Sequence, residues 1–168
     1  MKKINLMTYL YLIGFAVLTR IIPHPWNATA IGAIALFSGR EIKHPVLAYV
    51  IPLAALFASD LILGFHSTML FVYAAVALTV WMGQGLGSKY SGILFGSIAS
   101  SVSFFVITNF GVWFSANLYP MTSQGFLNCY AMAWPFFRSQ WVGDFIYVAA
   151  IFGCYELLRK LAQSKVSI

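Results

Sequence analysis

The chain has 168 residues, of which 61% are hydrophobic and 8% are charged, and its formal net charge is +6. Soluble domains carry about a quarter charged residues, so this composition excludes an ordinary soluble protein and predicts an integral membrane protein. A crossing needs about 20 mostly apolar residues, so the length allows about six short-looped helices in a single domain. The apolar runs are continuous rather than alternating, which argues against a β-barrel. The basic residues are scattered between these runs, so we expect no nucleic-acid partner.

The first apolar run, residues 4–22, follows Lys2 and Lys3 and has Arg20 near its end. No small-x-small cleavage pattern follows the run, and the run is longer than the core of a typical signal peptide. We therefore predict a retained first helix.

The second apolar run, residues 28–39, is unusually short. Pro23 and Pro25 separate it from the first helix, because proline fixes the backbone and removes a donor. Twelve helical residues reach only about 18 Å, which is less than the ~30 Å hydrocarbon core. The segment is therefore either shielded by other helices or begins inside the preceding turn.

The positive-inside rule decides whether this short segment crosses the membrane. If it does, eight basic residues lie on the inner side and two, Arg20 and Arg138, on the outer side. The eight are Lys2, Lys3, Arg40, Lys43, Lys89, Arg159, Lys160 and Lys165. If it does not, every later loop changes sides and the split becomes three inside to seven outside, against the rule. We therefore predict six crossings with both termini in the cytoplasm.

The remaining predicted spans are residues 45–64, 69–86, 90–111 and 140–158. Pro52 lies inside the third span, where membrane helices tolerate proline. Small residues recur at four-residue spacing in the fifth span, at Gly92 and Gly96, and in the sixth, at Ala149 and Gly153. This spacing lets another helix approach closely.

An aromatic outer segment, residues 112–139, separates the fifth and sixth spans, and residues 124–134 within it predict a short helix at membrane depth. Aromatic side chains with a few hydrogen-bonding groups are typical of a small-molecule site. Trp and Tyr are also enriched at lipid headgroups, so an amphipathic loop is the alternative.

Folding the six spans gathers the unusual polar residues at the outer side. This asymmetry predicts a cavity open to the outside rather than a continuous ion path. The candidate substrate contacts are Asp60, His66, Asn109, Tyr119, Tyr130, Arg138 and Asp144 for polar recognition and Trp113 and Trp134 for stacking.

Asp60 and Asp144 each lie about one turn below the outer end of a helix. Ionisable groups at membrane depth normally face the bundle interior and find a partner, and Arg20 and Arg138 are the expected counter-ions. Two hypotheses remain open: the pairs only hold helices together, or at least one carboxylate contacts substrate.

Glycine-rich phosphate loops and a Gly-x-Ser-x-Gly elbow are absent from the sequence, and we expect neither enzymatic activity nor a cofactor. An intramembrane metal-dependent enzyme using His24, His66 and the aspartates is one alternative, although no HxxxH or HxxE spacing supports a metal site. A ligand-free accessory subunit is another.

The chain resembles a family of small bacterial inner-membrane proteins without an assigned substrate. The runs that carry the resemblance are RIIPHPWN (20–27), IGAIALF (31–37), SDL (59–61), GFH (64–66), TNFGVW (108–113), LYP (118–120), PFF (135–137) and GD (143–144).

In architecture that family is similar to the substrate-binding S components of energy-coupling-factor (ECF) vitamin transporters, which have six helices, both termini inside and a pocket near the outer face. The resemblance implies a multi-pass protein of the bacterial inner (cytoplasmic) membrane that captures a vitamin or flat heterocycle, with an ECF coupling subunit and ATPases as partners. S components often dock through an Ala-xxx-Ala pattern on the first helix. Here the second segment carries Ala28-xxx-Gly32 and Ala35-xxx-Gly39 instead, so a solitary transporter remains an alternative.

Overall fold

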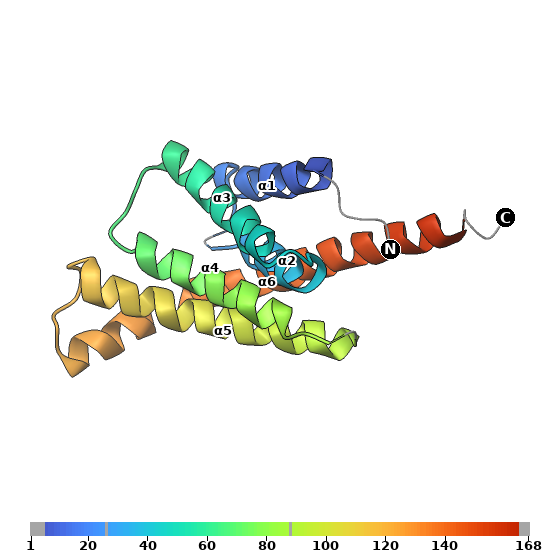
Figure 1. Ribbon diagram of the computed structural model, residues 1–168. Helices are drawn as coiled ribbons and strands as arrows, with labels where there is room; N and C mark the ends of the chain where they lie inside the picture. Colours follow the sequence, from blue (N-terminus) through green and yellow to red (C-terminus); the bar gives the residue numbers. More distant parts are fainter. Residues whose placement is uncertain (1–5, 26, 88, 165–168) are drawn as a thin grey trace.

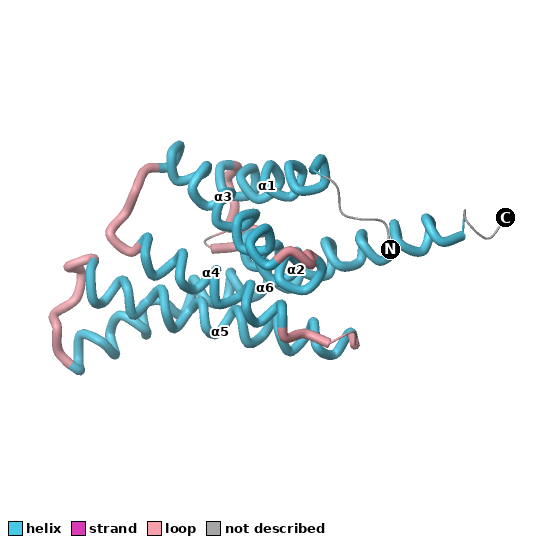
Figure 2. The backbone as a smooth tube through the Cα atoms, in the orientation of Figure 1, coloured by secondary structure: helices cyan, strands magenta, loops and turns pink. Residues whose placement is uncertain are grey.

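The computed structural model describes residues 6–25, 27–87 and 89–164, which form six helices and no strand. The helices are α1 (Leu6–Ile21), α2 (Ile31–Glu41), α3 (Pro45–Leu63), α4 (Met69–Gln84), α5 (Tyr90–Ser115) and α6 (Ser123–Ser164). They alternate in direction, so that α1 begins and α6 ends toward the same end of the bundle (Figure 1). The connections between them are loops (Figure 2). We call the end that holds the α3–α4 and α5–α6 loops the loop end.

Three helices, α3, α5 and α6, are long and apolar enough to cross a membrane, and α1 and α4 are shorter apolar helices. Large hydrophobic side chains are exposed around the bundle, among them Tyr11, Leu70 and Phe95. Such a continuous apolar exterior is unusual for a protein in water and suits contact with lipid chains.

The short helix α2 lies in the middle of the bundle, and nearly all of its residues from Ile31 to Gly39 are buried. At 11 residues it is only about 16 Å long. Because the other helices surround it, it does not have to match the thickness of the membrane. The sequence left open whether the segment is shielded or begins inside the preceding turn, and the structure shows that it is shielded.

Two glycines let α2 and α4 approach to backbone contact. A Cβ atom on Gly39 would collide with the carbonyl oxygen of Val80, and one on Gly83 would collide with that of Leu36. Any larger residue at either position would force the two helices apart. Gly39 was noted in the sequence only as part of a small-residue pattern, and its contact with α4 was not predicted.

The small residues that the sequence analysis compared with a docking pattern are mostly used inside the chain. Gly39 packs on α4, and a Cβ atom on Gly32 would lie 2.9 Å from Asp144 Oδ1. Gly96 likewise packs closely, since its Cβ atom would lie 2.9 Å from the side chain of Leu86. Around Gly153, in contrast, no described residue lies within 4 Å of the position of a Cβ atom, so no described helix packs closely there.

Helix α6 departs most from the prediction, because the expected short helix and the expected sixth span form one helix of 42 residues. Pro135 lies inside it without ending it. Proline removes one backbone hydrogen bond, and membrane helices tolerate that loss. At about 63 Å the helix is longer than the hydrocarbon core, and its first half packs along the last half of α5. Tyr130 Oη donates to the backbone oxygen of Val106 at 2.7 Å there.

Candidate functional site

A cavity of about 670 Å³ lies in the loop-end half of the bundle. Its walls come from the end of α1, the α1–α2 loop, the first residues of α2, and one face each of α3, α4, α5 and α6; the α3–α4 and α5–α6 loops also contribute. The lining residues are Arg20, His24, Asn27, Thr29, Ile31, Gly32, Leu56, Leu63, His66, Thr68, Val72, Thr79, Ser100, Phe104, Thr108, Asn109, Val112, Leu118, Tyr119, Cys129, Met132, Ala133, Phe136, Gln140 and Asp144. A volume of this size falls within the range of cavities that hold small organic ligands.

Helical spacing explains why distant residues share this cavity. On α5 the lining residues Ser100, Phe104, Thr108 and Val112 recur every four positions, so they lie on one face. Their span of twelve residues corresponds to about 18 Å along the helix axis. The cavity therefore extends from the loop end to about the middle of the bundle.

Arg20 lies in one wall of the cavity and is held by an ion pair. Its Nη2 lies 2.8 Å from Oδ1 of Asp60, whose side chain is 1% exposed. Its Nη1 donates to Ser59 Oγ at 2.8 Å, and Tyr73 Oη donates to Asp60 Oδ2 at 2.9 Å. Arg20 was expected to be a counter-ion of the buried aspartates, and in the structure its partner is Asp60. The charge of Arg20 is thus balanced by Asp60, which does not itself line the cavity.

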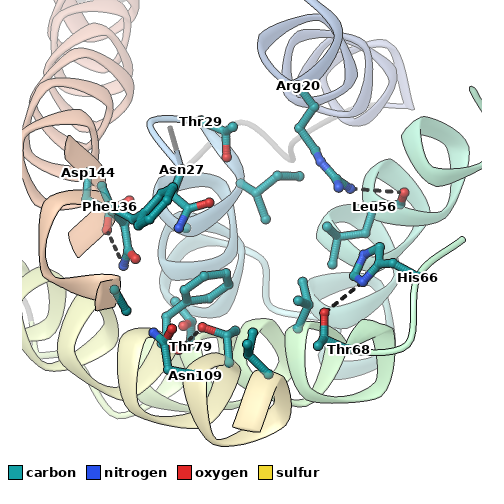
Figure 3. A pocket seen from close by; sticks show the side chains of 18 of the residues that line it. Arg20, Asn27, Thr29, Leu56, His66, Thr68, Thr79, Asn109, Phe136 and Asp144 are labelled. Atoms are coloured by element: carbon teal, nitrogen blue, oxygen red, sulfur yellow. Dashed lines mark hydrogen bonds between the residues drawn. The ribbon is translucent and has the colours of Figure 1, made fainter. Parts of the chain in front are cut away.

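Asp144 lies in the opposite wall, on α6 (Figure 3). Its Oδ2 accepts a hydrogen bond from Ser101 Oγ at 2.6 Å and one from Gln140 Nε2 at 3.4 Å. Gln140 Nε2 also donates to the backbone oxygen of Ser101 at 3.1 Å. Ser101 and Gln140 are neutral, so the carboxylate is the only charged group among these three residues. Their hydrogen bonds join α5 to α6 at the level where the cavity ends.

The mouth of the cavity carries further hydrogen-bonding side chains. His66 Nδ1 and Thr68 Oγ1 lie 2.8 Å apart beside the start of α4. The amide of Asn109 donates to the backbone oxygen of Phe105 at 2.8 Å, which leaves its side-chain oxygen available. Asn27, in the α1–α2 loop, has a φ of 59°, a left-handed conformation that asparagine tolerates better than most residues.

A family model described as a family of unknown function, DUF6580, matches residues 1–166, nearly the whole chain. The chain belongs to this family. No curated protein and no solved structure matches the chain.

In this DUF6580 chain the cavity brings together four of the nine predicted site residues, namely His66, Asn109, Tyr119 and Asp144. Asp60 lies directly behind Arg20 as its counter-ion. The other four, Trp113, Tyr130, Trp134 and Arg138, do not line the cavity.

The two tryptophans predicted to stack on a substrate, Trp113 and Trp134, instead contact other aromatic side chains of the chain. Trp113 packs edge to face on Phe126, Phe126 lies 4.6 Å from Tyr130 between ring centroids, and Trp134 lies 5.7 Å from Phe137. Trp134 is 56% exposed. The contact between Trp113 and Phe126 joins α5 to α6, whereas the other two contacts lie within α6, and none of these five rings lines the cavity.

Arg138 was expected as a counter-ion of the buried aspartates, but no described ion pair joins it to Asp60 or Asp144. Six residues on a helix correspond to about 600°, so the side chains of Arg138 and Asp144 point about 120° apart. Arg138 lines a second cleft, of about 560 Å³, together with His24 and Val142. The described ion pairs join Arg20 to Asp60, Arg40 to Glu41 and Arg159 to Glu156, and none involves Asp144.

Sequence reasoning missed several lining residues, among them Gly32, Thr79, Ser100 and Gln140. Gln140 had a usable signal, because it precedes Asp144 by four residues and so shares its helix face. Thr79 and Ser100 look like ordinary small polar residues of apolar helices. Among the described residues, no three His, Cys, Asp or Glu side chains gather in a way that could hold a metal ion.

Proposed function

We propose that this protein is a membrane transporter or substrate-binding subunit that captures a small nutrient at its outer face. The observation that carries the proposal is the 670 Å³ cavity at the loop end. Small-molecule sites are typically concave, mostly apolar and fitted with a few polar groups that fix orientation. Here Phe104 and Phe136 supply apolar area, and Asp144, Asn109 and His66 supply polar contacts.

The proposed topology is a six-helix bundle in the bacterial inner membrane, with both termini in the cytoplasm and the loop end outside. Two observations support it. The helices alternate in direction, and the distribution of Lys and Arg favours this orientation. The resulting layout is that of an ECF S component, with the cavity facing the outer side.

Movement of the captured molecule inward requires a source of energy or a slow reorientation of the protein. The sequence contains no nucleotide-binding loop, so active uptake would depend on a coupling subunit and ATPases. Gly39 is buried against α4 and Gly32 lies against Asp144, so both residues are used in packing within the chain and the proposed docking surface for such a subunit lies elsewhere. Copurification of an ATPase would identify the first route, and uptake by the protein alone in vesicles would identify solitary transport.

The test is to block the cavity and compare bound small molecules. Val112 lines the cavity on α5, whereas Val102, on the same helix, is 44% exposed and does not. Wild type, Val112→Trp and Val102→Trp would be purified, compared for copurifying small molecules by mass spectrometry, and screened for thermal stabilisation by a library of vitamins and related heterocycles. We expect one compound to bind wild type and Val102→Trp but not Val112→Trp. Failure of every compound to bind wild type, or equal binding to both variants, would contradict the proposal.

A further inference from the structure

Asp144 is a buried carboxylate with no ion-pair partner among the described residues. Asp144 is 8% exposed and lines the cavity. The other charged group of the lining, Arg20, is already paired with Asp60 at 2.8 Å. The histidines of the lining have contacts of their own, His24 Nδ1 with the Ile22 backbone oxygen and His66 Nδ1 with Thr68. Asp144 therefore leaves the cavity with a site for positive charge.

The two carboxylate oxygens of Asp144 have different surroundings. Oδ2 accepts the hydrogen bonds from Ser101 and Gln140. Oδ1 lies over the backbone of Gly32, where a Cβ atom would approach it to 2.9 Å. Among the described residues, no side chain donates to Oδ1. One oxygen is thus fixed by the protein, while the other remains able to accept a hydrogen bond from a molecule in the cavity.

Phe136 and Phe104 also line the cavity. In Figure 3 the ring of Phe136 lies beside Asp144, on the wall opposite Arg20. Aromatic faces attract cations through the ring quadrupole and provide flat contact area for planar groups. The combination of an unpaired carboxylate with an adjacent ring suits a flat, positively charged group that carries N–H donors.

We propose, building on the capture function above, that the ligand carries a planar cationic nitrogen group, an amidinium or a protonated amino-heterocycle, and that Asp144 binds it. The N–H groups of the cation donate to Asp144 Oδ1, and its plane packs beside Phe136. Gly32 is a positioning residue, since the absence of a side chain there leaves room for the carboxylate. A ligand that supplies the missing counter-ion also removes the cost of the buried charge.

The probe is benzamidinium, with neutral benzamide and anionic benzoate as compounds of similar shape. Their dissociation constants would be measured by ligand-observed NMR on wild-type protein in nanodiscs. We expect benzamidinium to bind most tightly, benzamide more weakly and benzoate least. The reverse order on wild type would overturn the inference without the need for any variant.

Two substitutions then assign the effect to Asp144. Asp144→Asn removes the charge but can still accept from Ser101, and it should weaken benzamidinium binding at least tenfold while leaving benzamide within about twofold. Gly32→Ala keeps the charge but displaces Oδ1, and the same selective loss is expected. Glu156→Gln, which alters an acidic residue paired with Arg159 at the other end of the bundle, is the control and should change neither.

Failure of this inference is distinguishable from failure of the capture function. Unchanged benzamidinium affinity in folded Asp144→Asn and Gly32→Ala would refute the role of Asp144, whatever the cavity-blocking variant shows. Loss of the natural compound from Val112→Trp together with unchanged benzamidinium binding in Asp144→Asn would leave capture standing with a different ligand chemistry.

Discussion

The ion pair between Arg20 and Asp60 is predicted to be essential for stability, because both partners are nearly buried and lie far apart in the sequence. Their side chains are 16% and 1% exposed, and the N–O distance is 2.8 Å. At that distance, and with an effective dielectric constant of about 20, the attraction between the two charges is about 6 kcal/mol. Removal of either charge leaves the other buried without a partner. We expect this to lower the free energy of unfolding by about 3–5 kcal/mol.

The assay is equilibrium unfolding of purified Arg20→Ala, Asp60→Ala and the double variant in detergent micelles, followed by circular dichroism. Each single variant should lose about 3–5 kcal/mol, and the double variant should lose clearly less than the sum, because it leaves no charge unpaired. Tyr73→Phe, which removes only the hydrogen bond to Asp60, should lose less than either single variant. Strictly additive losses, or a single-variant loss below about 1 kcal/mol, would refute the argument.

Two further predictions concern packing and the buried carboxylates. Gly39→Ala and Gly83→Ala should each lower the melting temperature strongly, because the new methyl group would collide with a backbone oxygen. The control Gly14→Ala should be neutral or slightly stabilising, because no atom lies within 4 Å of the new methyl group. Equal melting temperatures for all three variants would contradict the close approach of α2 and α4. Without ligand, Asp144→Asn should melt at or above the wild-type temperature, since the change removes an uncompensated buried charge, while Asp60→Asn should melt well below it. A marked destabilisation by Asp144→Asn would instead indicate a structural role for that carboxylate.

The order and approximate limits of the first five helices could be predicted from the sequence. Apolar length and breaking residues determine both, as at the end of α3, where Gly64 takes a φ of +96° that favours glycine. The predicted fourth span, residues 69–86, corresponds to Met69–Gln84. The count of basic residues predicts six crossings; in the structure the helices alternate in direction (Figure 1), and three of the described helices are long and apolar enough to cross a membrane.

The continuity of α6 could not be predicted in the same way. Pro135 and the mixed polarity of the preceding residues indicate a break in a protein surrounded by water. In the structure those residues are helical because their aromatic side chains pack on α5, as when Phe137 contacts Phe105 at 4.6 Å between ring centroids. Contacts between residues 32 positions apart stabilise the helix despite the local sequence that indicates a break. Patterns within a single segment do not reveal such contacts.

The sequence predicts a cavity lined by the outer polar residues. Which of these residues line it depends on the face that each helix turns inward. Arg138 and Asp144 are six residues apart on α6 and point about 120° apart, and only Asp144 lines the cavity. Residue type alone suggested both. The faces are set by the close packing of α2 against α4 at Gly39 and Gly83 and against α6 at Gly32, and these contacts are visible only once the helices are assembled.

Asp60 and Asp144 look alike in the sequence, since each is a carboxylate about one turn from the outer end of an apolar helix, but their neighbours separate them. The turn of α3 that carries Asp60 faces α1, where Arg20 is available as a counter-ion. The turn of α6 that carries Asp144 faces Ser101 and Gly32, neither of which can bear a charge. An amide at position 144 could join α5 to α6 through Ser101 equally well and without an unpaired charge. Among the described contacts of Asp144, none therefore requires its charge, and the proposed cationic ligand would provide the partner that buried charges need.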